Sequence, residues 1–199
     1  MNTVAVKGVA NAPFSPRKKI LPNSVFGTLA FVVTEVMFFV ALLSAYQVIK
    51  ARFGSWAPPQ GVTLFVVQTV VNLIILIVSG IFLYLSGRAK KAGSELRVYK
   101  GHYLRAIVLG TVFVLVQGWE WSQLFSAGLG FRNEIFGSIF YLIIGLHALH
   151  AVSAIVLMLL QFRKVRSGTV LLENIQAMQV YWYFIVGVWP ILYFNLYFP

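Results

Sequence analysis

The chain has 199 residues, of which 59% are hydrophobic and 11% are charged, and its mean hydropathy is +0.83. Soluble domains carry about 25% charged residues, so this composition excludes a soluble globular protein and indicates an integral membrane protein. A membrane-spanning helix uses about 20 residues, so five or six helices would occupy the chain and leave no room for a soluble catalytic domain. The absence of cysteine excludes disulfides, thiolate nucleophiles, iron–sulfur clusters and cysteine-ligated metals.

The formal net charge of +11 would suggest nucleic-acid binding if the protein were soluble. Here the basic residues flank apolar stretches, so membrane topology explains them better. We therefore expect no nucleic-acid partner.

Five apolar stretches follow a polar N-terminal tail, residues 1–25, which lacks the apolar run and cleavage site of a signal peptide. Each stretch is long enough to cross about 30 Å of hydrocarbon as a helix. The predicted spans are 26–49, 63–85, 104–125, 135–162 and 176–198. The sequence thus predicts an all-α integral membrane bundle of five transmembrane helices over residues 26–199.

The basic residues are distributed unevenly between the two ends of these spans. Four lie in the tail, six in or beside the second connection and three in the fourth. The first connection has two, the third has one and the C-terminus has none. The positive-inside rule then predicts a cytoplasmic N-terminus and an external C-terminus, which agrees with an odd number of spans.

Two glutamates, Glu35 and Glu120, lie inside apolar stretches, and the chain contains no aspartate. An ionisable side chain at that depth is costly, so each glutamate is a functional or interhelical site by default. At a rise of about 1.5 Å per residue, Glu35, His147 and His150 lie near the middle of the membrane, and Glu120 lies toward the outer leaflet. We therefore expect Glu35, His147 and His150 to form an intramembrane polar or proton-linked network.

Two interpretations of Glu35 stay open at this point. It could take part in a proton relay with a histidine, or it could be a protonated carboxyl that joins helices through a hydrogen bond to His147, to His150 or to a backbone carbonyl. A haem or metal site needs more converging ligands, and the remaining histidine, His102, lies at the inner boundary. We expect no catalytic residue, no metal and no cofactor bound by this chain.

Glu120 lies between Trp119 and Trp121, near the predicted outer interface. The three residues are candidates for contact with a lipid or a partner subunit. The alternative for Glu120 is a hydrogen bond between helices.

Polar and small residues at helical spacing predict the buried faces of several helices. On the first helix, small residues form a face that would let a neighbouring helix approach closely. The predicted inward-facing residues, taken helix by helix, are Ala41, Ser44 and Ala45 on the first helix; Gln68, Asn72 and Ser79 on the second; Gln117, Glu120 and Gln123 on the third; and Gln179 and Tyr183 on the fifth.

Four segments resemble subunit III of the haem-copper respiratory oxidases, in its short five-helix form. They are TEVMFF at 34–39, GWEW at 118–121, FGSIFYLIIGLHALH at 136–150 and YWYFIVGVW at 181–189. They occur in the order found in the family, and the likeness covers about residues 25–199. The chain departs from the family at Tyr183 and Val186, where many subunit III chains have a histidine and an aspartate.

The resemblance implies an accessory, non-redox subunit of a proton-pumping terminal oxidase in the bacterial cytoplasmic membrane. Haem and copper would then lie in the catalytic subunit I, with subunit II in the same complex. The implied roles are to stabilise subunit I, to bind structural phospholipids in a cleft between two groups of helices, and to support the supply of protons or oxygen. With Trp119, Glu120 and Trp121, the last-helix residues Trp182 and Trp189 are expected to contact lipid or another subunit.

Among oxidases, the expected enzyme is a cytochrome c oxidase. The alternatives are a quinol oxidase, a subunit-III-like protein that serves nitric oxide reductase, and a free-standing proton or ion transporter that would use Glu35 and the histidine pair. Donor binding and electron entry belong to other subunits, so this chain does not specify the electron donor or the haem type.

Overall fold

The structure, a computed structural model, describes residues 21–52, 66–127 and 135–197. These residues form five α-helices and no strand, and all five helices are long and apolar enough to cross a membrane. This confirms the predicted all-α fold with five candidate spans. Most of the expected tail, together with residues 63–65 and 198, lies outside the described residues. The helices are α1 (Asn23–Arg52), α2 (Val66–Lys91), α3 (Leu96–Ser126), α4 (Ile135–Arg166) and α5 (Leu172–Leu196).

The helices continue several residues beyond the predicted spans, chiefly at one end of the bundle. In hydrocarbon a helix satisfies all its backbone hydrogen bonds internally, and basic side chains let the same helix continue into the headgroup layer. Gly93 follows the last turn of α2 and Gly168 follows the last turn of α4, and their φ angles of 71° and 76° are left-handed. After α2, the amides of Gly93 and Ser94 donate to the carbonyl oxygens of Lys90 and Ala89, and this pattern is the Schellman motif that commonly ends a helix. Glycine adopts this conformation without strain, so both connections are short.

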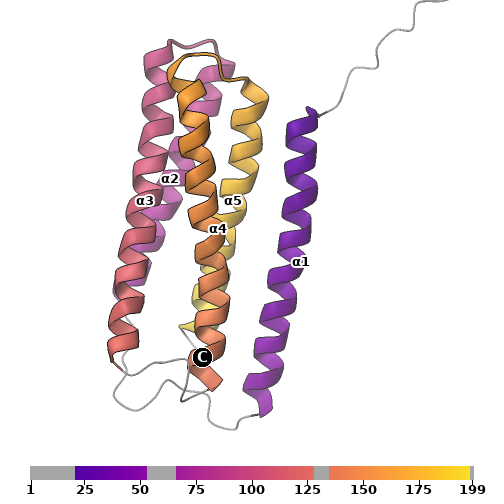
Figure 1. The fold of residues 1–199 in the computed structure, drawn as a ribbon, viewed down its shortest axis with the longest axis vertical. Helices are drawn as coiled ribbons and strands as arrows, with labels where there is room; N and C mark the ends of the chain where they lie inside the picture. The colour runs from indigo at the N-terminus through magenta and orange to yellow at the C-terminus, as the bar shows by residue number, and fades with distance from the viewer. Residues whose placement is uncertain (1–20, 53–65, 128–134, 198–199) are drawn as a thin grey trace, which may run out of the picture.

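Helices α2 to α5 form a four-helix bundle, and α1 lies beside it (Figure 1). α1 packs mainly against α5 and touches α4 only lightly. The start of α1 and the α2–α3 and α4–α5 turns lie at one end of the molecule, and α1 and α5 finish at the other end (Figure 1). The basic residues of the second and fourth connections are therefore gathered at the same end as the start of α1.

The core of the bundle is built around two fully buried tryptophans on α5. Trp182 packs over Gly110 of α3, where an added Cβ would lie only 2.8 Å from the indole ring. Trp189 contacts Phe113 of α3 edge to face, with ring centroids 5.5 Å apart. The prediction that Trp182 and Trp189 contact lipid or a second subunit is therefore wrong, because the other helices of this chain enclose both side chains.

The face that α1 turns toward the bundle also differs from the prediction. Phe39 and Tyr46 are buried, whereas Ala41, Ser44 and Ala45 are exposed. Aromatic packing, rather than close approach of small residues, thus attaches α1 to α5. Of the eight residues on the predicted polar faces, Asn72, Ser79, Gln117 and Glu120 are buried, and half-buried Gln179 donates to the Leu83 carbonyl of α2. The prediction is wrong for the other three, because Gln68, Gln123 and Tyr183 are exposed.

Candidate functional site

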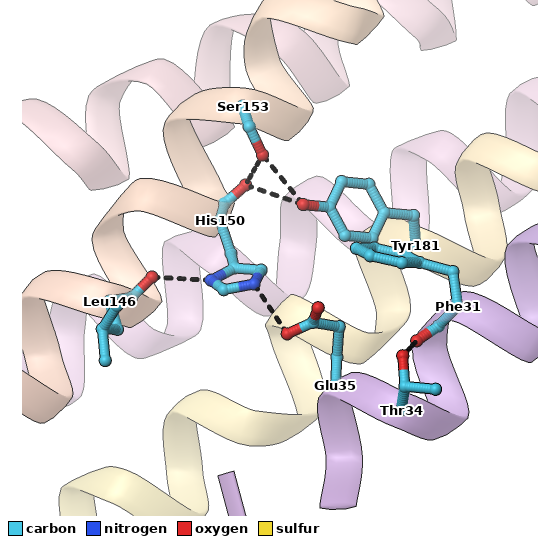
Figure 2. Close-up of polar contacts among 7 residues, drawn as sticks. All are labelled: Phe31, Thr34, Glu35, Leu146, His150, Ser153 and Tyr181. Carbon is cyan, nitrogen blue, oxygen red and sulfur yellow. Dashed lines mark hydrogen bonds and ion pairs between the residues drawn. The ribbon is translucent and has the colours of Figure 1, made fainter. Parts of the chain in front are cut away.

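The first candidate site is a pair formed by Glu35 of α1 and His150 of α4. His150 Nε2 lies 2.9 Å from Glu35 Oε2, and the two side chains are only 19% (Glu35) and 14% (His150) exposed. Figure 2 shows the carboxyl group reaching across from α1 to the imidazole ring. Among the described residues this is the one pairing of a carboxyl group with a basic side chain.

The hydrogen bond of the second ring nitrogen of His150 limits the protonation states that the pair can adopt. His150 Nδ1 lies 2.7 Å from the carbonyl oxygen of Leu146, and because a carbonyl only accepts, Nδ1 carries a hydrogen. Nε2 then either accepts a hydrogen bond from a neutral Glu35 carboxyl or, in the imidazolium form, donates a hydrogen bond to the Glu35 carboxylate. In both states the pair has no net charge, which makes its position inside the membrane tolerable.

A third helix joins the pair through Ser153 and Tyr181. The Ser153 hydroxyl donates to the backbone carbonyl of His150 at 2.8 Å and also lies 2.8 Å from the Tyr181 hydroxyl of α5. The Tyr181 ring contacts Phe31 of α1 edge to face at 5.8 Å (Figure 2). Residues of α1, α4 and α5 therefore meet at one level of the bundle.

His147 does not take part in this pair. Its ring is buried, stacks on Trp189 at 5.2 Å and contacts Phe39 at 6.2 Å, whereas neither ring nitrogen has a hydrogen-bond partner in the described part of the chain. His150 also contacts Phe39, with ring centroids 5.5 Å apart, so the two imidazoles share one aromatic neighbour. Residues three apart on a helix differ in direction by about 60°, and only the His150 ring reaches Glu35. The expected network of Glu35, His147 and His150 is thus reduced to Glu35 and His150.

No metal site is apparent in the described ranges, where no three His, Asp or Glu side chains converge. His102, the third histidine, stacks on Phe82 with ring centroids 5.9 Å apart, at the other end of α3 from Glu120.

A second polar cluster surrounds Glu120, toward the far end of the bundle. The carboxylate accepts from the Thr69 hydroxyl of α2 at 2.8 Å and from the Tyr197 hydroxyl, just after α5, at 2.8 Å. Gln117 donates to the same Tyr197 hydroxyl at 3.4 Å and accepts from Asn72 at 3.0 Å. Glu120 is 1% exposed, so its carboxylate forms the helix-to-helix hydrogen bond that was the alternative for this residue, and it has no surface for lipid contact.

The two tryptophans beside Glu120 lie differently. Trp119 is 55% exposed and faces away from the bundle, whereas Trp121 is half-buried and packs against the core. Trp119 thus remains available for contact with lipid or a partner.

Several residues of these clusters were not predicted, namely Ser153, Tyr181, Thr69 and Tyr197. Thr69 carried a signal, because Thr69, Asn72, Ser79 and Ser86 follow helical spacing and are all buried. The predicted face used Gln68 instead, one position away. Tyr197 carried no local signal, since its role depends on the end of α5 lying next to α3.

A groove runs between α1 on one side and α4 and α5 on the other, next to the Glu35–His150 pair. Its volume is about 630 Å³. Phe31 and Tyr181 line its deeper part, and Lys164 and Asn174 lie at the end where α4 finishes and α5 begins. The groove is therefore mostly apolar, and its polar lining consists of one cation, the amides of Gln161 and Asn174, and the hydroxyls of Thr28 and Tyr181.

The departure at Tyr183 and Val186 falls on the side of α5 that faces α2. Gly80 of α2 lies opposite both residues, and an added Cβ there would be 3.5 Å from Val186 and 3.9 Å from Tyr183. Neither residue lies in the groove beside Glu35.

Comparison with known proteins agrees with these features. The family model described as cytochrome c oxidase subunit III matches residues 18–199. The chain is 31% identical over 183 residues to a probable cytochrome c oxidase subunit 3 of Mycobacterium tuberculosis, covering 89% of each chain. It is 29% identical over 177 residues to cytochrome c oxidase subunit 3 of Thermostichus vulcanus, covering 87% of this chain and 86% of the relative. It is also 31% identical over 185 residues to the Corynebacterium diphtheriae subunit 3, covering 89% of each. The chain therefore belongs to the cytochrome c oxidase subunit III family.

Proposed function

We propose that this chain is the accessory, non-redox subunit of a proton-pumping cytochrome c oxidase, in which it stabilises the catalytic subunit I and holds structural phospholipids. As a subunit III it is one component of a terminal oxidase and a multi-pass membrane protein. Haem and copper would lie in subunit I, and subunit II would complete the assembly. The names of its relatives favour a cytochrome c oxidase over a quinol oxidase or a nitric oxide reductase.

The observation that carries the non-catalytic role is the use of both intramembrane carboxyl groups as links between helices. Glu35 connects α1 to α4, and Glu120 connects α3 to α2 and to the end of α5. Each carboxyl is therefore engaged in holding the bundle together. This use supports a scaffold more than a free-standing transporter.

We further propose that the end of the bundle with the α2–α3 and α4–α5 turns faces the bacterial cytoplasm. Both turns are flanked by basic residues, as the positive-inside rule requires. Arg88, Lys90 and Lys91 end α2, and Arg163, Lys164 and Arg166 end α4. The Glu120 cluster would then lie toward the outer side.

The groove beside Glu35 is the proposed site for a structural phospholipid. Lys164 would pair with the phosphate, Asn174 would donate to it, and the acyl chains would lie along Phe31, Leu157 and Tyr181. Oxygen partitions into apolar phases, so a lipid-filled groove would also offer it a path through the subunit.

The lipid assignment is tested by Lys164→Gln in the purified oxidase. We expect loss of about one phospholipid per complex, measured by quantitative lipid mass spectrometry, because the phosphate loses its cation. Arg166→Gln is the matched control, since Arg166 is exposed two residues away and does not line the groove. Equal lipid content in the two variants would reject this site.

The assignment to an oxidase is tested by purification through an affinity tag on this chain. Subunits I and II, haem and copper should be recovered with it in constant proportion. Recovery of the chain alone would contradict the proposal. Identification of the large partner by mass spectrometry distinguishes a cytochrome c oxidase from a quinol oxidase or nitric oxide reductase. The transporter alternative predicts proton flux in proteoliposomes that contain only this chain.

A further inference from the structure

A second recess lies between α2 and α5 at the end of the bundle that carries the basic turns. Its volume is about 570 Å³, and it is separate from the groove beside Glu35. α2 contributes Tyr84, Arg88 and Lys91, which share one face of the helix because they are spaced four and three apart. α5 contributes Gln176 and Gln179, again three apart.

The close approach of α2 and α5 at this recess depends on a glycine. A Cβ at Gly87 would lie 2.3 Å from the Gln179 amide nitrogen, so no larger residue fits there without moving this side chain. The Gln179 amide donates to the carbonyl oxygen of Leu83 at 2.9 Å. This bond holds α5 against α2 and gives the recess a fixed floor.

The recess is positively charged and has no internal counter-charge. Arg88 and Lys91 both line it, and none of the lining residues is acidic. In the part of the chain that the structure describes, neither cation pairs with a carboxylate. Two unpaired cations in one concavity favour an anion, and a guanidinium group matches the geometry of a phosphate.

The position of the recess selects a lipid phosphate over a dissolved anion. Arg88 lies three residues beyond the predicted end of the second span, at residue 85, so the recess is at headgroup level. The same face of α2 continues into the membrane with exposed apolar side chains, those of Tyr84, Ile81 and Ile77. An acyl chain attached to the phosphate would lie along this strip. Two cations also disfavour a zwitterionic headgroup, which brings a cation of its own.

We propose that the recess between α2 and α5 binds the phosphate group of an anionic phospholipid, with Arg88 and Lys91 as its charged ligands. Gln176 supplies an amide at the same recess, and Tyr84 lies at the junction between headgroup and acyl chain. Basic pockets between transmembrane helices are recurrent sites for anionic headgroups. This site differs from the groove beside Glu35 in its helices and in having two cations instead of one.

The test measures binding of phosphatidylglycerol to the intact oxidase in phosphatidylcholine nanodiscs. Each basic residue near the membrane surface contributes about a fivefold factor in affinity, so Arg88→Gln with Lys91→Gln should weaken binding at this site about 25-fold. The matched control is Arg97→Gln with Lys100→Gln, which removes the same charge from α3, outside the recess. The control should retain the wild-type affinity.

Arg88→Lys distinguishes loss of charge from poor assembly of the double variant, and Lys164→Gln distinguishes this recess from the groove beside Glu35. Arg88→Lys keeps the charge and should retain most of the binding even if the double variant assembles poorly. Lys164→Gln should leave this site unchanged, so the proposed groove beside Glu35 can fail without affecting the present proposal.

Three results would overturn the proposal. The first is equal loss of phosphatidylglycerol in the double variant and its α3 control, which would reflect general charge. The second is unchanged lipid affinity with loss of subunit I from the double variant, which would assign the recess to an acidic segment of a partner. The third is stabilisation of the delipidated complex by inorganic phosphate as large as that by phosphatidylglycerol, which would exclude a role for the acyl chains.

Discussion

Replacing Glu35 by leucine should loosen the attachment of α1 to the rest of the protein. His150 Nδ1 is bonded to Leu146, so the loss of the carboxyl leaves Nε2 as an unpaired polar atom between helices. An unpaired buried polar group costs about 1–3 kcal/mol, and hydrogen bonds between membrane helices contribute about 0.6 kcal/mol on average and at most about 1.7. Since the pair is partly exposed, we expect a cost of about 1–2 kcal/mol, which raises the ratio of detached to attached α1 by about 5- to 30-fold.

Glu35→Gln should behave like the wild type, because its amide N–H can donate to His150 Nε2. Combining Glu35→Leu with His150→Leu should detach α1 less than the sum of the two single substitutions, since no polar group is then left unpaired. Thr34→Leu is the control, because Thr34 is an exposed neighbour whose hydroxyl bonds only to its own helix at Phe31.

The chain contains no cysteine, so two introduced cysteines give unique sites for spin labels. Val33 on α1 and Leu149 on α4 are suitable because they are 52% and 63% exposed. Distances between the labels, measured in lipid nanodiscs, report the fraction of molecules in which α1 is detached from the bundle. Equal distance distributions for Glu35→Leu and Glu35→Gln would refute the reasoning, as would an equal shift in Thr34→Leu.

Two further predictions concern the bundle itself. Gly110→Ala should lower the unfolding free energy by about 1–3 kcal/mol, since its Cβ would overlap Trp182, whereas Gly118→Ala, with open space around it, should have little effect in the same thermal unfolding assay. Thr69→Val should lower it by about 1 kcal/mol by removing a hydroxyl that donates to the buried carboxylate of α3. Thr111→Val, whose hydroxyl bonds within its own helix, is the comparison, and an equal loss there would show that the α2–α3 bond contributes nothing.

The hydrogen-bond partners of the two intramembrane glutamates could be predicted only in part. Their presence in apolar spans indicated polar partners on other helices, and both have such partners. For Glu35 the candidates included His147 and His150, and the spacing of these two residues along α4 did not distinguish them. The choice follows from the rotation of α4, which turns His147 toward Trp189 and His150 toward α1.

Burial of the tryptophans shows a similar limit. An aromatic residue in a transmembrane helix suits a lipid interface and a packed core equally well, so composition does not separate the two. Trp119 faces outward, whereas Trp182 fills the space above Gly110. That difference depends on a glycine on another helix, which no local pattern in α5 reveals.

The sequence alone determined that this protein is a five-helix membrane protein, where each helix lies along the chain, and to which family it is similar. These properties follow from hydropathy and from the requirement that backbone groups in lipid bond within their own helix. Only the tertiary structure decided which face of each helix is inside, that α1 stands beside a four-helix bundle, and that Glu120 meets Tyr197. Polar residues at helical spacing mark the inner face of α2, but most lipid-facing and core-facing side chains in a membrane are both apolar. Hydrophobic periodicity therefore does not identify the inner face of the other helices, and shape and hydrogen-bond complementarity between helices decide it.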